Sequence, residues 1–387
     1  MRIVADENIP LLEPFCGGLG SLTRVNGRTL NRDQLLDADV LLVRSVTRVD
    51  ARLLSGTPVR FVGTATIGTD HVDTDWLADA GIAFTSAPGC NASSVVQYVL
   101  SVVSLLLQRQ QRADLRGLSV GVVGAGNVGG RLVRALQGMG VEVRVSDPPL
   151  EASGSDLPFA PLDEVLACDV VSLHTPLTRQ GRHATLHLLD DQALARIGPG
   201  QLLINSGRGP VIDNRALLHR LQAPDAPLVA LDVWEHEPEP LPELMDHCWL
   251  ATPHIAGYSL EGKSRGTEML ASALHQWAGV AMDTHLASVL PEPALTTLTF
   301  GRNAAPLSTL HQALMTCYDP RDDDSRLRQA FANADADGAP RGPVFDGLRK
   351  RYPIRREPNS LAVRVPQGSE CFQLLAASGF QVVEASG

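Results

Sequence analysis

Hydrophobic and polar residues along this chain follow two patterns, short apolar runs and longer stretches with helical spacing. Short apolar runs that end in glycine or polar residues are typical of buried strands in parallel sheets. Runs of this kind lie at residues 2–5, 40–43, 60–63, 82–84, 119–123, 141–145, 169–173, 201–205, 228–233 and 250–254. Because helical patterns separate many of them, the sequence predicts an α/β protein with parallel sheets, whose ligands bind at the carboxyl ends of the strands.

Two long helical stretches and a change of texture predict how the chain divides. Residues 93–112 leave the first block of strands as an apolar-rich helix, and residues 261–281 form a second helix that returns the chain to this block. Beyond about residue 286, acidic and Gly/Pro-rich segments interrupt weaker strand and helix patterns. We therefore expect a first domain formed by residues 1–95 and 257–285, a second formed by residues 96–256, and a small third α/β domain formed by residues 286–387.

One glycine-rich turn stands between a predicted strand and a predicted helix. The strand at residues 119–123 runs into Gly124, Gly126 and Gly129, which have the spacing GxGxxG, and a helix follows. Gly124 permits the tight turn, Gly126 lets a pyrophosphate approach the backbone, and Gly129 lets the helix pack closely on the strand. The helix N-terminus adds free N–H groups and the positive end of a dipole. The turn therefore predicts a dinucleotide-binding site.

An acidic residue at the appropriate distance indicates which dinucleotide binds. The next strand, at residues 141–145, is followed by Asp147. This position lies roughly 20 residues past the glycines, where dinucleotide-binding folds place the group that binds the adenosine ribose hydroxyls. A carboxylate there would repel a 2′-phosphate, so we expect NAD rather than NADP.

The composition argues against several classes of function. The chain has 387 residues, of which 44% are hydrophobic and 20% charged, and 33 Lys and Arg against 43 Asp and Glu give a net charge of −10. This balance argues against a nucleic-acid-binding surface. Six cysteines without a CxxC pair fit a reducing compartment. The N-terminus carries charges where a signal peptide needs an apolar core, and no uninterrupted apolar run is long enough to span a membrane. We therefore expect a cytoplasmic protein with neither nucleic-acid nor membrane partners.

Three polar residues of the second block together suit hydride transfer. Arg208, Glu237 and His254 each lie at or just past the end of a predicted strand. Oxidation of an alcohol by a nicotinamide needs a base for the hydroxyl proton, and histidine titrates near neutral pH. A carboxylate bound to the other ring nitrogen would fix the tautomer, and a guanidinium would hold a substrate carboxylate with two hydrogen bonds.

Each of these residues also has a structural explanation. A single Arg after a strand is often a surface residue, and a lone His is often structural. Glu237 lies close to Glu235 and Glu239, so all three acids fit a solvated loop. His236 stands between two acids but lacks a second ligand at helical spacing, so we expect no metal site. The joint placement of the three polar residues behind a dinucleotide-binding fold favours catalysis over these explanations.

Several segments carry a resemblance to a known family. They lie at residues 6–10, 43–47, 63–73, 87–92 and 252–263, and in the tail at residues 318–324 and 345–352. The chain resembles the D-2-hydroxyacid dehydrogenases over its first 285 residues or so, and the tail resembles the C-terminal domain of one branch of that family. The resemblance implies a flavodoxin-like substrate-binding domain, an NAD-binding Rossmann domain and a small C-terminal dimerisation domain, so that the protein would be a homodimer. It also implies NAD-dependent oxidation of a phosphorylated 2-hydroxy acid in pyridoxal 5′-phosphate (vitamin B6) biosynthesis.

The resemblance assigns roles residue by residue. It implies that His254 is the acid/base, that Glu237 orients it, and that Arg208 binds the substrate carboxylate. Substrate contacts would come from Ser45, Thr66 and Tyr258. Contacts with NAD would come from Asn127, Val128, Asp147, Thr175, Asp232 and Gly257, beside the glycine turn. One departure is Gly207, where we expect a residue with a side chain; it would leave Arg208 held less firmly.

The substrate phosphate and two alternative functions remain open at this stage. Arg44 ends a strand beside Ser45, and we expect it to carry most of the phosphate recognition; the basic run at residues 349–351 is a second candidate, either across a dimer or simply as a solvated face. A 3-phosphoglycerate dehydrogenase shares the three catalytic residues and a phosphorylated substrate. A non-catalytic, NAD-sensing corepressor shares the fold.

Overall fold

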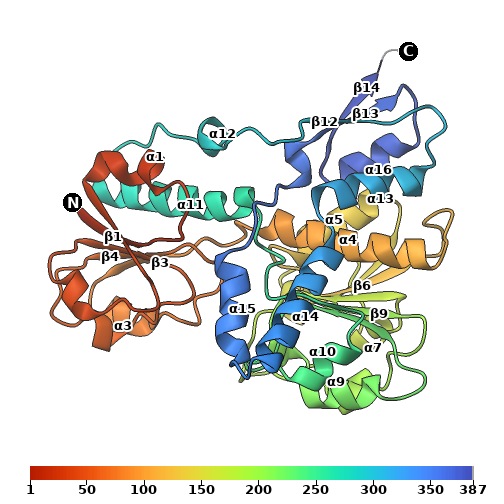
Figure 1. The fold of residues 1–387 in the computed structure, drawn as a ribbon, viewed down its shortest axis with the longest axis horizontal. Helices are drawn as coiled ribbons and strands as arrows, with labels where there is room; N and C mark the ends of the chain where they lie inside the picture. The colour runs from red at the N-terminus through yellow and green to blue at the C-terminus, as the bar shows by residue number, and fades with distance from the viewer. Residues whose placement is uncertain (386–387) are drawn as a thin grey trace. The chain divides into compact units, whose positions relative to one another are not determined.

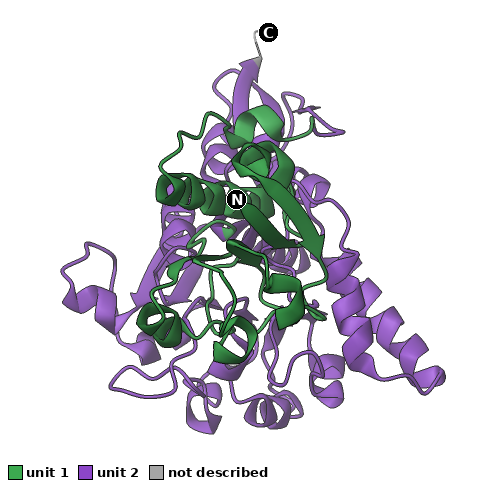
Figure 2. Ribbon diagram, turned by 90° about the vertical axis from the view of Figure 1, so that its left-hand side faces the viewer, with its two compact units in different colours: residues 1–91, 259–292 green, residues 92–258, 293–387 purple. Residues whose placement is uncertain are grey.

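The computed structural model describes residues 1–385 and divides into two compact units (Figure 2). Unit 1 comprises residues 1–91 and 259–292, and unit 2 comprises residues 92–258 and 293–387. The sequence places the first two crossings between domains near residues 95 and 257, within a few residues of these positions. It also expects a separate domain after residue 285, whereas the structure groups the C-terminal segment with unit 2.

Unit 1 is built on a five-stranded parallel sheet in the order β2-β1-β3-β4-β5. Its strands are β1 (Arg2–Asp6), β2 (Ser21–Val25), β3 (Val40–Val43), β4 (Phe61–Thr64) and β5 (Ala83–Thr85). Its α-helices are α1 (Leu12–Cys16), α2 (Ala51–Leu54), α3 (Thr74–Asp79), α11 (Leu260–Ala278) and α12 (Leu286–Val289). Strand β2 has no counterpart among the predicted strands, because it lies at a sheet edge and its side chains are exposed or half-buried.

Alternate residues of the central strands of unit 1 face two hydrophobic cores. Leu42 packs in one core with Leu270 of α11, and its neighbour Leu41 packs in the other with Leu77 of α3. Successive side chains of a strand point to opposite faces of a sheet, so a fully apolar strand can serve two cores. Helix α11, predicted at residues 261–281, is thus the element that ties the returning chain to the first sheet.

Unit 2 contains a six-stranded parallel sheet in the order β11-β10-β9-β8-β6-β7. Strands β6 and β9 of this sheet are labelled in Figure 1. Its strands are β6 (Ser119–Val123), β7 (Glu142–Ser146), β8 (Val170–Leu173), β9 (Leu202–Asn205), β10 (Leu228–Leu231) and β11 (Leu250–Ala251). Strand β7 is added on one side of β6 and β8 on the other, so the strand order reverses at β6. Parallel folds bind ligands outside the carboxyl ends of the strands at such a switch point.

Helices pack on both faces of this sheet, in two separate hydrophobic cores. One core includes α4 (Ala92–Arg109) and α5 (Gly129–Gly138). The opposite core includes α7 (Leu162–Leu166), α8 (Asp191–Leu194), α9 (Asn214–Leu221) and α10 (Pro242–His247). The short helix α6 (Pro148–Ala152) follows β7. The two parallel sheets and their helices confirm the predicted α/β class.

One helix, α4, is long and apolar enough by length and composition to cross a membrane. The sequence shows no uninterrupted apolar run of that length because Gln97 and several serines interrupt the helix. In the structure 83% of the helix is buried. Its apolar residues are therefore accounted for by packing against the sheet of unit 2.

The C-terminal segment of unit 2 adds a three-stranded parallel sheet, in the order β12-β13-β14, and four α-helices. These elements are β12 (Thr297–Thr299), α13 (Pro306–Cys317), α14 (Pro320–Ala336), α15 (Arg341–Lys350), β13 (Ala362–Pro366), α16 (Cys371–Ala377) and β14 (Gln381–Ala385). Leu314 and Leu375 belong to the same core as α4 and α5, while Phe331 and Phe345 belong to the opposite core. The segment thus contributes to both cores of the larger sheet, which explains why it does not separate as a unit of its own.

Two buried charged residues of the C-terminal segment hold the points where the chain enters and leaves unit 2. The Arg355 guanidinium donates to the carbonyl oxygens of Ser94 and Ala256, and Glu357 Oε1 accepts a 2.9 Å hydrogen bond from the Ser94 hydroxyl. Ser94 follows the crossing after residue 91, and Ala256 precedes the crossing after residue 258. The C-terminal segment therefore fixes both of these crossings from within unit 2.

Candidate active site

The glycine turn has the backbone geometry that its sequence predicts. Gly124 follows β6 with a φ of +84°, a left-handed conformation that strains other residues. A Cβ at Gly129 would lie 1.9 Å from the carbonyl oxygen of Gly124, so a side chain there would separate helix α5 from the turn. Asn127 is exposed and Val128 half-buried at the start of α5. Their backbone therefore lies beside the N-terminus of a helix that packs against β6.

Two buried hydroxyls and an open space at Gly126 suit a dinucleotide at the carboxyl edge of the unit 2 sheet. Thr175 Oγ1 and Ser206 Oγ, just past β8 and β9, are buried and have no hydrogen-bond partner. Buried polar atoms in proteins are almost always paired, so these two hydroxyls indicate a polar ligand. A Cβ at Gly126 would meet nothing within 4 Å. The residues present therefore fit NAD, and Ser206 is a candidate for contact with it that the sequence pattern did not single out.

Asp147 lies at the end of β7 and caps the short helix after it. Its Oδ1 accepts a 3.1 Å hydrogen bond from Leu150 N, and its Oδ2 accepts one of 2.8 Å from Ala125 N in the glycine turn. A carboxylate has about four acceptor sites, so two bonds leave it able to accept from ribose hydroxyls. Asp147 thus joins the second strand to the glycine turn, and it remains half-buried.

His254 and Glu237 form a hydrogen-bonded pair. The His254 Nδ1 and the Glu237 Oε2 are 2.7 Å apart, and Oε1 of Glu237 accepts a 2.9 Å bond from Trp234 N. Both carboxylate oxygens are therefore used, and the imidazole is held by one nitrogen. Within residues 1–385 no protein partner is found for the other nitrogen, Nε2, and 34% of the His254 side chain is exposed. This is the arrangement that an acid/base histidine requires.

The backbone of His254 is held in an unusual conformation by Asp232. His254 has a φ of +56°, which is uncommon for a residue with a side chain. Asp232, at the end of β10, accepts hydrogen bonds of 2.8 Å from Ile255 N and 2.9 Å from Ala256 N. The Thr252 hydroxyl donates a third bond of 2.7 Å. Asp232 therefore fixes the turn on both sides of His254, and one acceptor site of its carboxylate remains.

The charge of Glu237 is maintained despite its burial. Burial of the carboxyl raises its pKa, but His254, Arg349 and the Trp234 N–H lower it further, so the net pKa lies below the ordinary value of 4.5. The negative charge next to His254 is therefore present throughout the neutral pH range. Arg349 belongs to α15, so one of the charges acting on this pair comes from the C-terminal segment.

Arg208 begins a short turn after β9 that Asn205 organises. Asn205 Oδ1 accepts from Gly207 N at 3.1 Å, and its Nδ2 donates to the Arg208 carbonyl at 3.0 Å. A Cβ at Gly207 would approach the carbonyl oxygens of Thr175 and Leu173 to 3.2 and 3.3 Å, closer than most Cβ contacts. Glycine at this position therefore allows the turn to approach the end of β8 closely. Although Gly207 has no side chain, Asn205 holds the backbone of this turn through its two hydrogen bonds.

The remaining residue of unit 2 with an expected substrate role is Tyr258. Gly257 and Tyr258 follow His254 within four residues, and Tyr258 N donates to the Ile255 carbonyl at 2.8 Å. The Tyr258 ring packs edge-on against Tyr352, with centroids 5.8 Å apart, and the Arg349 guanidinium lies 5.6 Å from its centroid. Tyr258 is thus held by the C-terminal segment.

Three expected substrate residues lie in unit 1, at the carboxyl edge of its sheet. Arg44 and Ser45 follow β3, and Thr66 follows β4, its neighbour in the sheet. Arg44 is half-buried and Ser45 is exposed. The Thr66 hydroxyl donates to the Gly68 carbonyl at 2.8 Å and lies 2.7 Å from the Thr64 hydroxyl. Unit 1 therefore brings these three residues to one edge.

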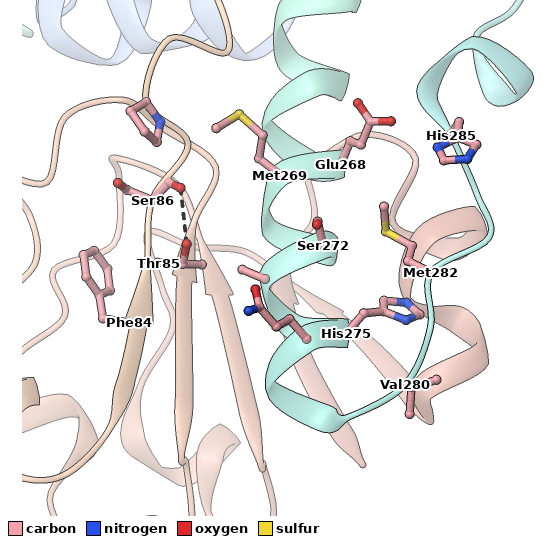
Figure 3. Close-up of a pocket in the computed structure, with 13 residues that line it drawn as sticks. Phe84, Thr85, Ser86, Glu268, Met269, Ser272, His275, Val280, Met282 and His285 are labelled. Atoms are coloured by element: carbon pink, nitrogen blue, oxygen red, sulfur yellow. Dashed lines mark hydrogen bonds between the residues drawn. The ribbon is translucent and has the colours of Figure 1, made fainter.

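Unit 1 also has a surface cavity of about 1030 Å³ that contains none of the predicted site residues (Figure 3). It is lined by residues at the end of β5 and just after it, and by one side of α11 with the segment that follows it. Glu268 accepts a 2.7 Å bond from Leu286 N, and the two ring nitrogens of His275 contact the carbonyl oxygens of Ala281 and Phe15. These polar groups hold neighbouring backbone in place, so we do not assign chemistry to this cavity.

Comparisons with known proteins agree with this geometry. Residues 105–256 match the family model described as "D-isomer specific 2-hydroxyacid dehydrogenase, NAD binding domain". Residues 289–379 match a model described as "Domain of unknown function (DUF3410)". The fold, the dinucleotide edge and the first match together define an NAD-dependent dehydrogenase of the D-2-hydroxyacid dehydrogenase class.

Curated relatives narrow the family further. A protein of Marinobacter nauticus named "Erythronate-4-phosphate dehydrogenase" is 54% identical over 385 residues, covering 99% of this chain and 100% of the relative. A protein of the same name from Pseudomonas aeruginosa (strain UCBPP-PA14) is 50% identical over 384 residues, covering 99% and 100%. The chain belongs to the erythronate-4-phosphate dehydrogenase family.

Solved structures show the same fold over about three quarters of the chain. NAD⁺-bound 3-phosphoglycerate dehydrogenase of Entamoeba histolytica superposes with a TM-score of 0.61 and 21% identity, covering 72% of this chain and 95% of that one. D-Lactate dehydrogenase of Aquifex aeolicus, complexed with NAD and lactic acid, gives a TM-score of 0.58 and 23% identity, covering 72% and 96%. At this identity the likeness concerns the fold.

Proposed function

We propose that this protein oxidises 4-phospho-D-erythronate to (R)-3-hydroxy-2-oxo-4-phosphobutanoate with NAD, a step of pyridoxal 5′-phosphate (vitamin B6) biosynthesis. The observation that carries the proposal is the 2.7 Å pair of His254 and Glu237, which lies in the same unit as the dinucleotide edge. The substrate is inferred from the name of relatives that match the whole chain at 50–54% identity.

The residues of unit 2 divide the chemistry among them. NAD, when bound, accepts the hydride from C2 of the hydroxy acid. The Nε2 atom of His254 accepts the proton of the C2 hydroxyl, and the Glu237 carboxylate stabilises the imidazolium that results. Arg208 binds the substrate carboxylate and thereby orients C2.

Binding of the cofactor is proposed for the groups at the carboxyl edge of the sheet. The glycine turn at residues 124–129 and the N-terminus of α5 would hold the pyrophosphate, and Asp147 would bind the adenosine ribose. Thr175 and Asp232 would contact NAD further along the edge, together with Gly257. The carboxylate of Asp147 favours NAD over NADP.

Binding of the substrate is proposed for Ser45, Thr66 and Tyr258, with Arg44 carrying most of the phosphate recognition. Arg44 is the cation at the carboxyl edge of the unit 1 sheet beside Ser45. An Arg44→Ala variant should raise KM for the phosphorylated acid, because a guanidinium–phosphate contact is charge-assisted. An unchanged KM would remove Arg44 from the phosphate site.

The proposed assembly and location follow the same reasoning. We place a substrate domain at residues 1–95 and 257–285, an NAD domain at residues 96–256, and a dimerisation role in residues 286–387. The protein would then be a cytoplasmic homodimer without nucleic-acid or membrane partners. Light scattering of the purified protein would test the dimer, since a monomeric mass would contradict it.

A turnover assay separates this proposal from the two alternatives. The protein with NAD should prefer 4-phosphoerythronate to 3-phosphoglycerate and to unphosphorylated erythronate, with a 2-oxo acid added as a possible reoxidant. Preference for 3-phosphoglycerate would move the protein to serine synthesis with the same mechanism. Binding of NAD without turnover on any of these acids would favour an NAD-sensing corepressor.

A further inference from the structure

The three residues of the basic run at 349–351 differ in how far they are buried. Lys350 and Arg351 are exposed, whereas Arg349, on the last turn of α15, has its Nε atom buried without a hydrogen-bond partner. Leaving a guanidinium donor both desolvated and unpaired costs free energy, which proteins normally avoid. We therefore expect the Arg349 Nε to donate a hydrogen bond to a group outside the described residues, such as a bound ligand.

The surroundings of Arg349 are those of the catalytic pair. Its guanidinium lies 5.6 Å from the centroid of the Tyr258 ring. Burial lowers the pKa of Arg349, but the charges of Tyr258, Glu237 and Asp346 and a hydrogen bond with Tyr258 raise it above its ordinary value. Glu237 acts on Arg349 through its charge, but both of its carboxylate oxygens already accept hydrogen bonds, from Trp234 N and at His254. Within the described residues Arg349 and Glu237 interact through their charges and not through a hydrogen bond, so Arg349 lies beside the proposed catalytic pair with its Nε donor unpaired.

The packing around Arg349 fixes its position. Tyr352 donates a 2.7 Å hydrogen bond to Asp323 Oδ2 and packs edge-on against Tyr258. The Arg349 guanidinium lies over the Tyr258 ring, a cation–π arrangement that keeps the side chain ordered. Its planar fork of N–H donors is thus preorganised for an oxyanion, and such a fork matches a carboxylate or a phosphate.

We propose that Arg349, supplied by the C-terminal segment of the same chain, binds the phosphate of the substrate. This inference rests on the proposed function, in which Arg208 takes the only carboxylate of the hydroxy acid and leaves the phosphate as the second anionic group. It assigns a role to the segment that matches a domain of unknown function.

Steady-state kinetics with two substrates test the proposal. In full-length protein with NAD, Arg349→Ala should raise KM for 4-phosphoerythronate by about 30-fold with little change in kcat, because a charge-assisted hydrogen bond is lost on binding. The value of kcat/KM for unphosphorylated erythronate should not change. Arg349→Lys should recover part of the loss, and the exposed neighbour provides the control, since Arg351→Ala should behave as the wild type.

An equal loss of kcat/KM on both substrates would overturn phosphate binding, because Arg349 would then act through Glu237 or Tyr258. An unchanged KM for 4-phosphoerythronate would overturn it as well. Failure of the proposed function is a different result, since the wild type itself would turn over neither acid.

A binding measurement keeps the inference testable even if turnover is absent or Arg349→Ala does not fold. Inorganic phosphate is titrated calorimetrically into NADH-saturated wild type and Arg349→Lys, with Arg351→Ala as the control. We expect phosphate to bind the wild type and the control alike and to bind Arg349→Lys at least several-fold more weakly. Equal phosphate affinity in all three proteins, or no binding by the wild type, would overturn the inference.

Discussion

A single turn, residues 234–238, supplies the acids of two histidine–carboxylate pairs. Glu237 lies 2.7 Å from His254 Nδ1, and Glu235 lies 2.7 Å from His187 Nε2. Both histidines also have left-handed backbone, with φ of +56° and +50°. In distance and backbone the two pairs are alike.

They differ in what is left for a ligand. The second ring nitrogen of His187 faces Asp213 Oδ2 at 3.5 Å, and Glu235 also accepts a 2.9 Å bond from Asn214 N. His254 has no partner at its second nitrogen within the described residues. Both ring nitrogens of His187 therefore face a carboxylate, whereas within residues 1–385 only one ring nitrogen of His254 does. The comparison teaches that an acidic partner does not single out the histidine proposed as the acid/base. The second ring nitrogen of His254, unpaired among the described residues, does.

The His187 cluster also bears on metal binding. His187, Asp213 and Glu235 lie close enough together that they could hold a metal ion. Their side chains are, however, already joined by hydrogen bonds and ion pairs, and Asp213 caps helix α9 through Arg215 N and Ala216 N. These contacts explain the cluster as a brace between the 234–238 turn and α9. His236, considered from the sequence, is not part of it.

The largest effect among the acids should follow from removing the charge beside His254. Glu237→Gln should lower kcat by roughly 100-fold or more, since the imidazolium formed in the reaction loses its counter-charge. The acid limb of the kcat/KM profile against pH should move to lower pH for the same reason. Equal kcat for Glu237→Gln and wild type would remove Glu237 from the mechanism.

The same substitution has a consequence for stability. The pKa of Glu237 is lowered in the folded protein, so its ionised form contributes stability above the ordinary value of 4.5 and loses this contribution as the pH falls through the folded pKa. The difference in unfolding free energy between wild type and Glu237→Gln should therefore shrink as the pH falls below the ordinary value of 4.5. Chemical denaturation across this range would measure it, and a difference that grows on acidification would contradict the assignment.

A smaller loss of kcat is expected from replacing Asp232, which holds the backbone next to His254. Asp232→Asn would place the side-chain NH2 group opposite one of the two backbone N–H groups from which Asp232 now accepts hydrogen bonds, so that bond would be lost. We expect kcat to fall about 10-fold and the unfolding free energy to fall by about 1–3 kcal/mol, the cost of an unsatisfied buried group. Kinetics and urea denaturation of the variant would check both values, and unchanged kcat would show that the turn holds without Asp232.

The brace should affect stability more than catalysis. Glu235→Ala removes the contacts with His187 and Asn214 N, so we expect a loss of about 1–2 kcal/mol in unfolding free energy and less than about a fivefold change in kcat. The backbone bond from Glu235 N to Asn214 Oδ1, of 3.2 Å, remains to hold the turn. If Glu235→Ala lowered kcat as much as Glu237→Gln, the Glu235–His187 pair could not be a purely structural contact.

The smallest effect is expected from replacing Asp213, the second carboxylate beside His187. Asp213→Asn keeps an acceptor for the N-cap of α9 and loses only the 3.5 Å contact with His187, which is exposed in part. A change of less than about 0.5 kcal/mol is expected in thermal or urea unfolding. A larger loss would show that His187 depends on both of its carboxylates.

Strand and turn patterns predicted the strands of the unit 2 sheet well. The apolar runs before Gly124, Thr175 and Asn205 became neighbouring parallel strands, because buried parallel strands are apolar on both faces and are visible in a single sequence. The polar residues after them therefore had to meet at one edge. Arg208, Glu237 and His254 followed from that rule and from the chemistry of alcohol oxidation, although their roles remain proposals.

Other features depend on contacts that are distant in sequence. Glu235, His236 and Glu237 are alike in composition, and the distinction between them arises from His187 and His254, which lie 48 and 17 residues away from their partners. Arg349 cannot be told from Lys350 and Arg351 until Tyr258 packs beside it. The sequence pattern provided no boundaries for α13, α14 and α15. The last two contribute Phe331 and Phe345 to a core of the unit 2 sheet, a contact with segments that are distant in sequence.

The most direct test of the account compares the two histidines in the same experiment. NADH formation in a single turnover is followed by stopped-flow absorbance with saturating NAD and 4-phosphoerythronate, for wild type, His254→Gln and His187→Gln. The account predicts a rate roughly 1,000-fold lower for His254→Gln and within about fivefold of the wild type for His187→Gln. A His254→Gln rate close to that of the wild type, or an equal loss in both variants, would contradict the assignment of proton transfer to His254.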